Sequence, residues 1–229
     1  MSSPSSLVVA IDGPSGSGKS TVARRVADAL GLRYLDTGAM YRALTWWLLE
    51  HGVDLGDQDR VDRLAKELPL RMGTDPVHPT VHVGDTDVGT AIRETRISAV
   101  VSIVARNLGV RAELVQRQRA VVDDGGVVVE GRDITSVVAP GAAVRILLTA
   151  SEEVRLARRA RDMHGVDHDA AVAATHDQVV RRDADDSTVA SFLEAAEGVD
   201  VVDSTHLSPD QTVAAVLDLI HRRAGVAPA

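Results

Sequence analysis

The sequence predicts an α/β protein whose parallel β-sheet core is covered by helices on both faces. Apolar runs of strand length alternate with segments of helical periodicity along the 229 residues, which is the order typical of parallel sheets. In addition, the apolar run at residues 7–11 is followed at once by a glycine-rich segment and then by a helix with one apolar face. We expect this strand–loop–helix unit to organise the rest of the chain.

The glycine-rich segment at residues 13–21 matches the phosphate-loop pattern G-x-x-x-x-G-K-[ST]. Its glycines permit tight turns that bring backbone N–H groups onto phosphate oxygens, and the following helix adds the positive end of its dipole. Lys19 is expected to reach the terminal phosphates and the Ser20 hydroxyl to face Mg²⁺. A flexible turn without a ligand is the alternative, and the Lys-Ser pair and the flanking elements disfavour it. The fold is therefore predicted to be that of a P-loop NTPase, which binds ATP through Gly13, Pro14, Ser15, Gly16, Ser17, Gly18, Lys19, Ser20 and Thr21.

The composition is that of an ordinary globular protein, with 45% hydrophobic and 25% charged residues. A net charge of −8 argues against a nucleic-acid partner, and the absence of cysteine excludes disulfides and thiolate metal sites. No apolar run is long enough to cross a membrane, and the first six residues lack the pattern of a signal peptide. We expect one domain, without a membrane or nucleic-acid partner, in the cytoplasm.

A second strand is predicted at residues 32–35, followed by Asp36 and a helix that carries Arg42. Ligands of open α/β sheets bind outside the carboxyl ends of the strands, so residues 36–42 are expected to face the phosphate loop across that crevice. Taken alone, Asp36 could be only a helix cap and Arg42 only a solvated helix residue.

The pattern weakens between residues 55 and 89, where prolines and glycines punctuate a short helix and a strand at residues 81–83. We interpret this stretch as an inserted subdomain, either a substrate-binding flap or a tolerated surface insertion. Helical periodicity returns at residues 97–106 and 114–122, and the buried strand at residues 127–129 ends on Glu130. Glu130 is expected to hold the metal directly or through water, although many strands end in an acid.

A further strand is predicted at residues 144–148, and the helix after it carries four arginines. These arginines form either a solvated face paired with neighbouring acids or a phosphate clamp. The last strand is predicted at residues 199–202. Residues 208–211 form a capping box that opens the closing helix.

The class of phosphate-loop protein can be narrowed. GTPases read guanine through N-K-x-D, but the one asparagine, Asn107, is followed by Leu108. The signature of transporter ATPases is absent, and the chain is short for a motor. A small-molecule kinase with two phosphorylated substrates in one crevice remains.

Four blocks then resemble the bacterial cytidylate kinases, in order and spacing over residues 8–220. They are GPSGSGKST at 13–21, LDTGAMYR at 35–42, EGRDI at 130–134, and the pairs Arg182-Asp183 and Asp186-Ser187. The resemblance implies a core at about 7–54, 97–151 and 183–224, a monophosphate-binding insertion at about 55–96, and a helical lid at about 152–182. It also implies Mg²⁺-dependent transfer of a phosphoryl group from ATP to CMP or dCMP. We expect the protein to be a monomer.

The resemblance also assigns roles by position. Arg42 and Arg132 are expected to hold the acceptor phosphate, and Arg182 and Asp186 the sugar hydroxyls. The arginines of the lid are expected to close on the transferring phosphoryl group. A further set of residues is expected to form the cytidine pocket together with Asp36. These residues are Arg155, Arg158 and Arg159 of the lid, and Thr37, Tyr41, Ser102, Arg111 and Asp133 of the cytidine pocket.

Two positions depart from the family pattern. Val189 stands where the family usually has an arginine over the bound base, and residues 190–193 lack the proline that follows it. Thr135-Ser136 replaces the usual Gly-Thr, which alters only a loop. Because of Val189, a kinase that acts on UMP or another small metabolite remains an alternative. A degenerate regulatory nucleotide-binding module is the alternative outside enzymes, and the intact Lys19, Arg42 and Arg132 argue against it.

Overall fold

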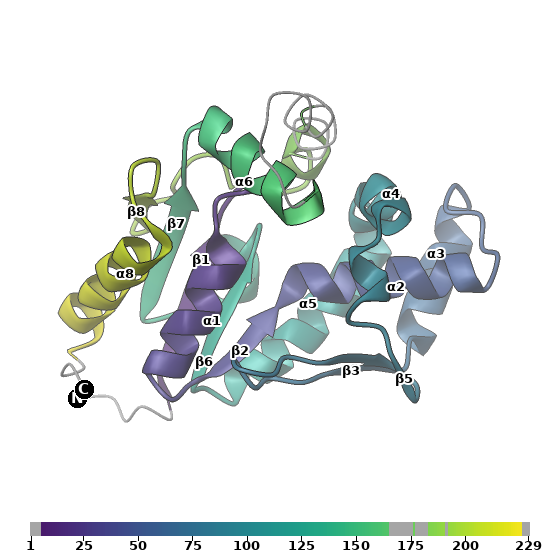
Figure 1. Cartoon of the computed structure of the whole chain (residues 1–229). Helices are drawn as coiled ribbons and strands as arrows, with labels where there is room; N and C mark the ends of the chain where they lie inside the picture. Colours follow the sequence, from purple (N-terminus) through teal and green to yellow (C-terminus); the bar gives the residue numbers. More distant parts are fainter. Residues whose placement is uncertain (1–5, 165–175, 177–182, 191, 226–229) are drawn as a thin grey trace.

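Five parallel strands form the central sheet of the computed structural model, which describes residues 6–164, 176, 183–190 and 192–225. The strand order is β2-β6-β1-β7-β8, so the chain crosses over between neighbouring strands (Figure 1). In the register, Val8 of β1 lies opposite Val127 of β6, and Val9 opposite Val144 of β7. The strands are β1 (Val8–Asp12), β2 (Arg33–Asp36), β6 (Val127–Gly131), β7 (Val144–Thr149) and β8 (Asp200–Asp203).

Helices cover both faces of this sheet, as the alternation of strands and helices predicts. Val127 and Val129 of β6 pack into the apolar cluster of α2 (Thr37–Glu50) and α5 (Leu108–Asp123). Val128 points to the other face, into the cluster of α1 (Lys19–Ala29) and α8 (Pro209–Ala224). Because β6 is buried on both faces, its sequence is a continuous valine run rather than an alternating one.

A small antiparallel sheet lies in the stretch that was interpreted as an insertion. It is formed by β3 (Leu70–Met72), β4 (Val81–Val83) and β5 (Thr86–Asp87), and it is preceded by α3 (Gln58–Glu67), which packs against α5 and α2. A 3₁₀ turn (Ala91–Arg93) and α4 (Thr95–Ala105) lead back to the core. The β3–β4 loop contacts the core, since Tyr34 N donates to Thr74 O (2.8 Å) and Arg24 Nε to Pro76 O (2.9 Å).

After β7 the chain enters α6 (Glu152–His164), and residues 183–187 are again helical. Arg182 and most of the lid predicted after residue 164 lie outside the described residues. The predicted capping box is confirmed: Ser208 accepts from Gln211 N, and the Gln211 side chain accepts from Ser208 N. A π-helical turn (Ile134–Val138) was not predicted.

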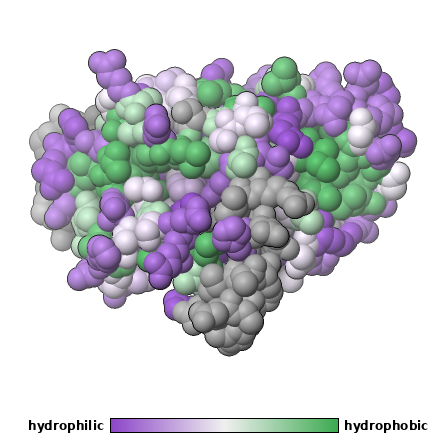
Figure 2. Space-filling view, turned by 90° about the horizontal axis from the view of Figure 1, so that it is seen from above, coloured by the Kyte–Doolittle hydropathy of each residue, from purple (hydrophilic) through white to green (hydrophobic). Residues whose placement is uncertain are grey.

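The surface seen from above interleaves hydrophilic residues with smaller apolar areas (Figure 2). Among the described residues, no helix combines the length and the apolar character needed to cross a bilayer.

Candidate active site

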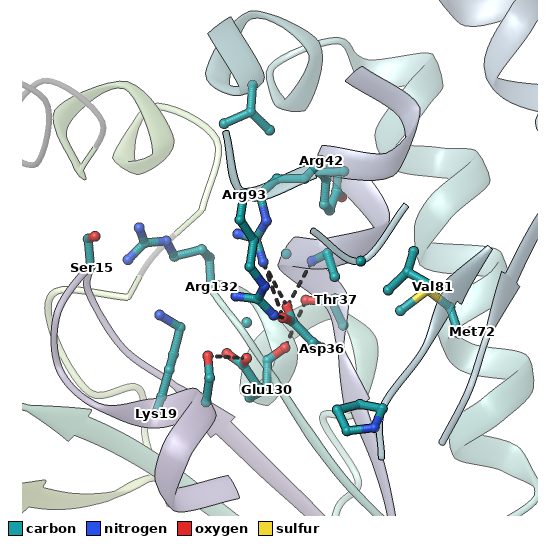
Figure 3. A pocket seen from close by; sticks show the side chains of 18 of the residues that line it. Ser15, Lys19, Asp36, Thr37, Arg42, Met72, Val81, Arg93, Glu130 and Arg132 are labelled. Carbon is teal, nitrogen blue, oxygen red and sulfur yellow. Dashed lines mark hydrogen bonds and ion pairs between the residues drawn. The ribbon is translucent and has the colours of Figure 1, made fainter. Parts of the chain in front are cut away.

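A cavity of about 1220 Å³ opens where β1, β2 and β6 end. Its walls come from the phosphate loop, from the start of α2, from the small sheet and the 3₁₀ turn, and from residues 186–190. Figure 3 shows Lys19, Glu130, Asp36, Arg42, Arg93 and Arg132 directed into this space from different elements. Segments that are far apart in the sequence therefore meet at the edge of the sheet that the sequence predicts to be functional.

The phosphate loop wraps tightly around the start of α1. Gly16 and Gly18 have positive φ angles of 77° and 86°, which side chains other than glycine rarely adopt. A Cβ on Gly13 would stand 2.2 Å from Leu148 O, so the loop also needs glycine there for close packing on β7. Lys19 donates to Pro14 O (3.4 Å) across the loop. The cavity is lined by Ser15, Gly16, Gly18, Lys19, Ser20 and Thr21, whereas Gly13, Pro14 and Ser17 lie behind this surface.

Glu130 is the buried acid at the end of β6, and two hydroxyls donate to one of its oxygens. The distances to Glu130 Oε1 are 2.6 Å from Ser20 Oγ and 3.2 Å from the Tyr34 hydroxyl. Burial is the main cause that raises the pKa of Glu130, and the neighbouring Asp36 raises it further, while Lys19 opposes both. Thr37 Oγ1 donates to the backbone oxygen of Glu130 (2.9 Å), which ties β6 to the start of α2.

Asp36 has two roles at the mouth of α2. It caps the helix by accepting from Ala39 N (2.8 Å), and it pairs with Arg42 Nη2 (3.1 Å). Arg93 approaches the same carboxylate at 3.9 Å from the 3₁₀ turn (Figure 3). Arg42 Nε is buried and finds no hydrogen-bond partner among the described residues. Two guanidinium groups thus lie near one carboxylate, and the Nε of Arg42 remains available as a donor.

Arg132 crosses the cavity toward the phosphate loop. It donates to Gly13 O (2.8 Å) and pairs with Asp183 (3.0 Å) and Asp186 (3.3 Å). Its guanidinium also lies over the Phe192 ring, 4.4 Å from the centroid. Asp183 in turn accepts from Ser15 N (3.0 Å). Asp183 is thereby fastened to the phosphate loop both directly and through Arg132.

A polar pocket forms the far end of the cavity. Arg111 of α5 donates to Asp133, and Ser102 of α4 donates to Asp186 (3.1 Å). Burial raises the pKa of Asp133, and Arg111 opposes this rise. The Tyr41 ring lines the same space, and burial raises the pKa of its hydroxyl.

The three lid arginines have different positions. Arg155 is buried and bonded to Ser15 O (2.9 Å) and Asp183 (2.6 Å). Arg158 donates to Ser204 Oγ (2.9 Å) and Ser204 O (2.8 Å), on the side of the phosphate loop away from the cavity. Arg159 lines the cavity. In this state of the molecule Arg159 is therefore the lid arginine that faces the space where a ligand would lie.

The sequence analysis missed four residues that shape this site. Arg93 lay inside the predicted insertion, and its Thr-Ala-Ile neighbours gave no signal. In the sequence Asp183 is visible only as part of a motif, although in the structure it holds both Arg132 and Arg155. Tyr34 was assigned only to a strand. Asp12 accepts from Ile134 N, Thr135 N and Thr135 Oγ1 (2.7–2.8 Å), so it anchors the segment that carries Arg132.

The departures at residues 189 and 190 lie at the cavity itself, since Val189 and Ala190 both line its wall. An aliphatic side chain therefore stands where the family pattern has a cation.

Comparison with known proteins gives consistent findings. The family model described as "Cytidylate kinase" matches residues 9–222. A cytidylate kinase of Cutibacterium acnes is 48% identical over 221 residues, covering 95% of this chain and 97% of its own. One of Rhodococcus opacus is 45% identical, covering 98% and 99%. A crystal structure of an uncharacterized protein from Eubacterium ventriosum covers 95% of this chain and 99% of its own, with a TM-score of 0.52 and 12% identity, and this likeness concerns the fold alone.

Proposed function

The chain belongs to the cytidylate kinase family, and from this premise we propose that its cavity transfers the terminal phosphoryl group of ATP to CMP or dCMP, giving CDP or dCDP. The observation that carries the proposal is that a phosphate loop and three arginines of other segments, Arg42, Arg93 and Arg132, line one cavity. Such a cavity can hold two phosphorylated ligands with their phosphates toward each other.

The donor side is proposed to be residues 13–21. Backbone N–H groups of the loop and Lys19 would neutralise the β- and γ-phosphates of ATP. Because Gly16 and Gly18 already hold their left-handed conformations, this cradle needs little rearrangement when the nucleotide binds. ATP is thus proposed to enter along the phosphate loop.

The acceptor phosphate is proposed to bind between Arg42, Arg93 and Arg132. Arg42 is held by Asp36 and Arg132 by the pair Asp183 and Asp186, while the exposed Arg93 approaches Asp36 at 3.9 Å. These ion pairs keep the guanidinium groups oriented before the ligand arrives. The buried Nε of Arg42, which has no partner in the described part of the chain, offers a donor that a phosphate oxygen would satisfy.

The base and sugar of the acceptor are proposed to occupy the polar pocket. Arg111 and Asp133 offer a donor and an acceptor side by side, which is the pattern needed to read the edge of a pyrimidine. Thr37 and Tyr41 are proposed to complete this wall, and Asp186 with Arg182 to bind the sugar hydroxyls. Ser102 does not line the cavity and is proposed to support the pocket from behind, through its hydrogen bond to Asp186. Val101 and Ala105 of α4 supply apolar contact to the same cavity.

Mg²⁺ is proposed to bind at Ser20 and Glu130. The site offers oxygen atoms, as hard divalent cations prefer, and Glu130 is a buried acid whose charge lacks solvent. The described residues contain no group of three or more acids, cysteines or histidines that could hold a metal ion, so most ligands would come from phosphate oxygens and water. When held at Ser20 and Glu130, Mg²⁺ would neutralise the negative charge that develops on the phosphates.

The chemistry requires positioning rather than a base. An acceptor phosphate is already ionised, so the arginines and Lys19 need only align it and stabilise charge on the equatorial oxygens. Arg155, Arg158 and Arg159 are proposed to act from the lid, with Arg159 already at the cavity. Closure of lid and insertion over both nucleotides would exclude water, which otherwise would hydrolyse ATP.

The organisation follows from the same proposal. The core is proposed to span about residues 7–54, 97–151 and 183–224, with the insertion at 55–96 and the lid at 152–182. We propose a monomer, because one chain contributes every residue of the site. We also propose a cytoplasmic location, where ATP and nucleoside monophosphates are available.

Exchange of Lys19 for alanine tests the proposal. Lys19→Ala is expected to lower kcat for CMP-dependent ADP formation by about 100-fold or more, because the positive charge that stabilises the transferring phosphoryl group is removed. The matched control is Lys66→Ala, which changes the other lysine of the chain, an exposed residue paired with Asp62. A coupled ADP-release assay measures both. Near-normal turnover by Lys19→Ala would contradict the mechanism.

A further inference from the structure

Gln118 of α5 is an amide buried in the apolar layer beneath the acceptor pocket. It is 1% exposed, and Leu114 and Val115 of the same helix belong to the apolar cluster on that face of the sheet. Neither its oxygen nor its nitrogen has a hydrogen-bond partner among the described residues. Because a buried amide without partners retains the full cost of losing water, packing alone gives no reason for glutamine at this position.

The Tyr41 hydroxyl shares this condition. It is buried and unpartnered among the described residues, although the Tyr41 ring lines the cavity. Tyr41 lies on α2, which packs against α5. Burial raises the pKa of the Tyr41 hydroxyl. The Gln118 amide lies near enough to oppose this rise as a hydrogen-bonding neighbour. The two groups are therefore adjacent but are not aligned in a hydrogen bond.

Arg111 and Asp133 complete the surroundings of this pair. Gln118 follows Arg111 by seven residues, so both lie on the same face of α5. Arg111 and Asp133 satisfy each other, and both influence Tyr41 electrostatically. The unsatisfied atoms are thus concentrated at Tyr41 and Gln118, one step behind the wall that a ligand would touch.

We propose that Gln118 is a positioning residue for the acceptor nucleotide, acting through Tyr41. Its amide N–H donates to the buried Tyr41 hydroxyl oxygen when the acceptor binds, which fixes the Tyr41 side chain in the cavity wall against the nucleotide. The apolar surroundings leave the amide no competing partner among the described residues, which makes Tyr41 its partner by default. This inference rests on the proposed function and deepens it, because it adds a residue that does not itself line the cavity.

A double-mutant cycle tests this inference, with Gln118→Met, Tyr41→Phe and the double variant. Methionine keeps the length of glutamine and removes both polar atoms. Gln118→Met is expected to raise KM for CMP by about tenfold, the value of one hydrogen bond of intermediate strength, while KM for ATP and kcat stay unchanged. Its Tm is expected to be equal to or above that of the wild type, because an unsatisfied amide is removed. In the Tyr41→Phe background the same exchange is expected to have no further effect.

Gln116→Met is the matched control, because Gln116 is an exposed residue of the same helix. It is expected to leave both KM values unchanged. If the effects of Gln118→Met and Tyr41→Phe multiply in the double variant, Gln118 does not act through Tyr41 and the inference is overturned. A lower Tm of Gln118→Met together with an equal rise in KM for CMP and for ATP would overturn it as well, since that result indicates a role in packing alone. Failure of the wild type to phosphorylate CMP would instead reject the proposed function.

Discussion

Acidic side chains determine where the site arginines point. Arg42 and Arg93 are gathered by Asp36, and Arg132 and Arg155 by Asp183. A long arginine side chain loses rotamer freedom when it is ordered, so a protein partner that orders it beforehand lowers the cost of binding phosphate. This accounts for acids in a cavity proposed to bind anions.

Asp12 is the acid that anchors the segment after Arg132 to the end of β1. Its carboxylate accepts three hydrogen bonds from Ile134 and Thr135, and it is 1% exposed. Asp12→Asn is expected to lower the free energy of unfolding by about 2 kcal/mol, because an NH₂ group then faces N–H donors in a buried place. Urea denaturation followed by circular dichroism measures this difference.

The control for Asp12 is Asp218→Asn, at an exposed position of α8. Surface exchanges of this kind change stability by about 0.5 kcal/mol or less. Equal stability of the Asp12→Asn variant and the wild type would show that the carboxylate does not anchor residues 134 and 135.

Individual residues were predictable from the sequence where a motif fixes them. Lys19, Ser20 and Glu130 follow from the phosphate loop and the strand that ends beside it, and Ser20 indeed contacts Glu130. The contact between Ser15 and Asp183 joins residues 168 positions apart, and nothing local in either segment indicates it. The contact of Tyr34 with Glu130 could not be predicted either, because an aromatic residue in a strand more often belongs to the core than to a polar network.

Among the elements, the closing helix shows how local chemistry fixes a boundary. The Ser208 cap places the first turn of α8, whose Val213, Val216 and Ile220 pack into the cluster shared with α1. Ser208→Ala is expected to lower the free energy of unfolding by about 1 kcal/mol, because Gln211 N loses its acceptor. Thermal and chemical denaturation of the purified variant measure the loss.

Ser136→Ala is the matched control, since Ser136 is an exposed serine within the π-helical turn and caps no helix. It is expected to keep wild-type stability. If Ser208→Ala were no less stable than this control, the capping box would not contribute to the fold.

The strands of the central sheet were predicted well, and their ends shifted by one or two residues, as is usual for such boundaries. The strand expected at 7–11 is β1 at Val8–Asp12, and the one expected at 199–202 is β8 at Asp200–Asp203. The predicted helix at 114–122 is the middle of α5, which begins at Leu108 because Asn107 caps it by accepting from Val110 N. The π-helical turn after β6 could not be predicted, since Asp12, over 120 residues earlier, holds it in place.

At the scale of the whole molecule, an acidic chain carries a locally basic cavity. The net charge is −8, yet Lys19, Arg42, Arg93, Arg132 and Arg159 all line one space. The overall charge disfavours nonspecific contact with nucleic acid, while the cavity concentrates positive charge where small phosphorylated ligands would bind. Its walls include both the core and the inserted sheet, so the two parts are proposed to act as one substrate site.

The measurement that tests this account most directly is ADP release with ATP and Mg²⁺ over a panel of CMP, dCMP, UMP, AMP, GMP and dTMP. The account predicts that turnover is confined to CMP and dCMP, because the Arg111–Asp133 pair selects the base and Val189 is tolerated in the cavity wall. Preferential turnover of UMP, or turnover of none of the six, would contradict it.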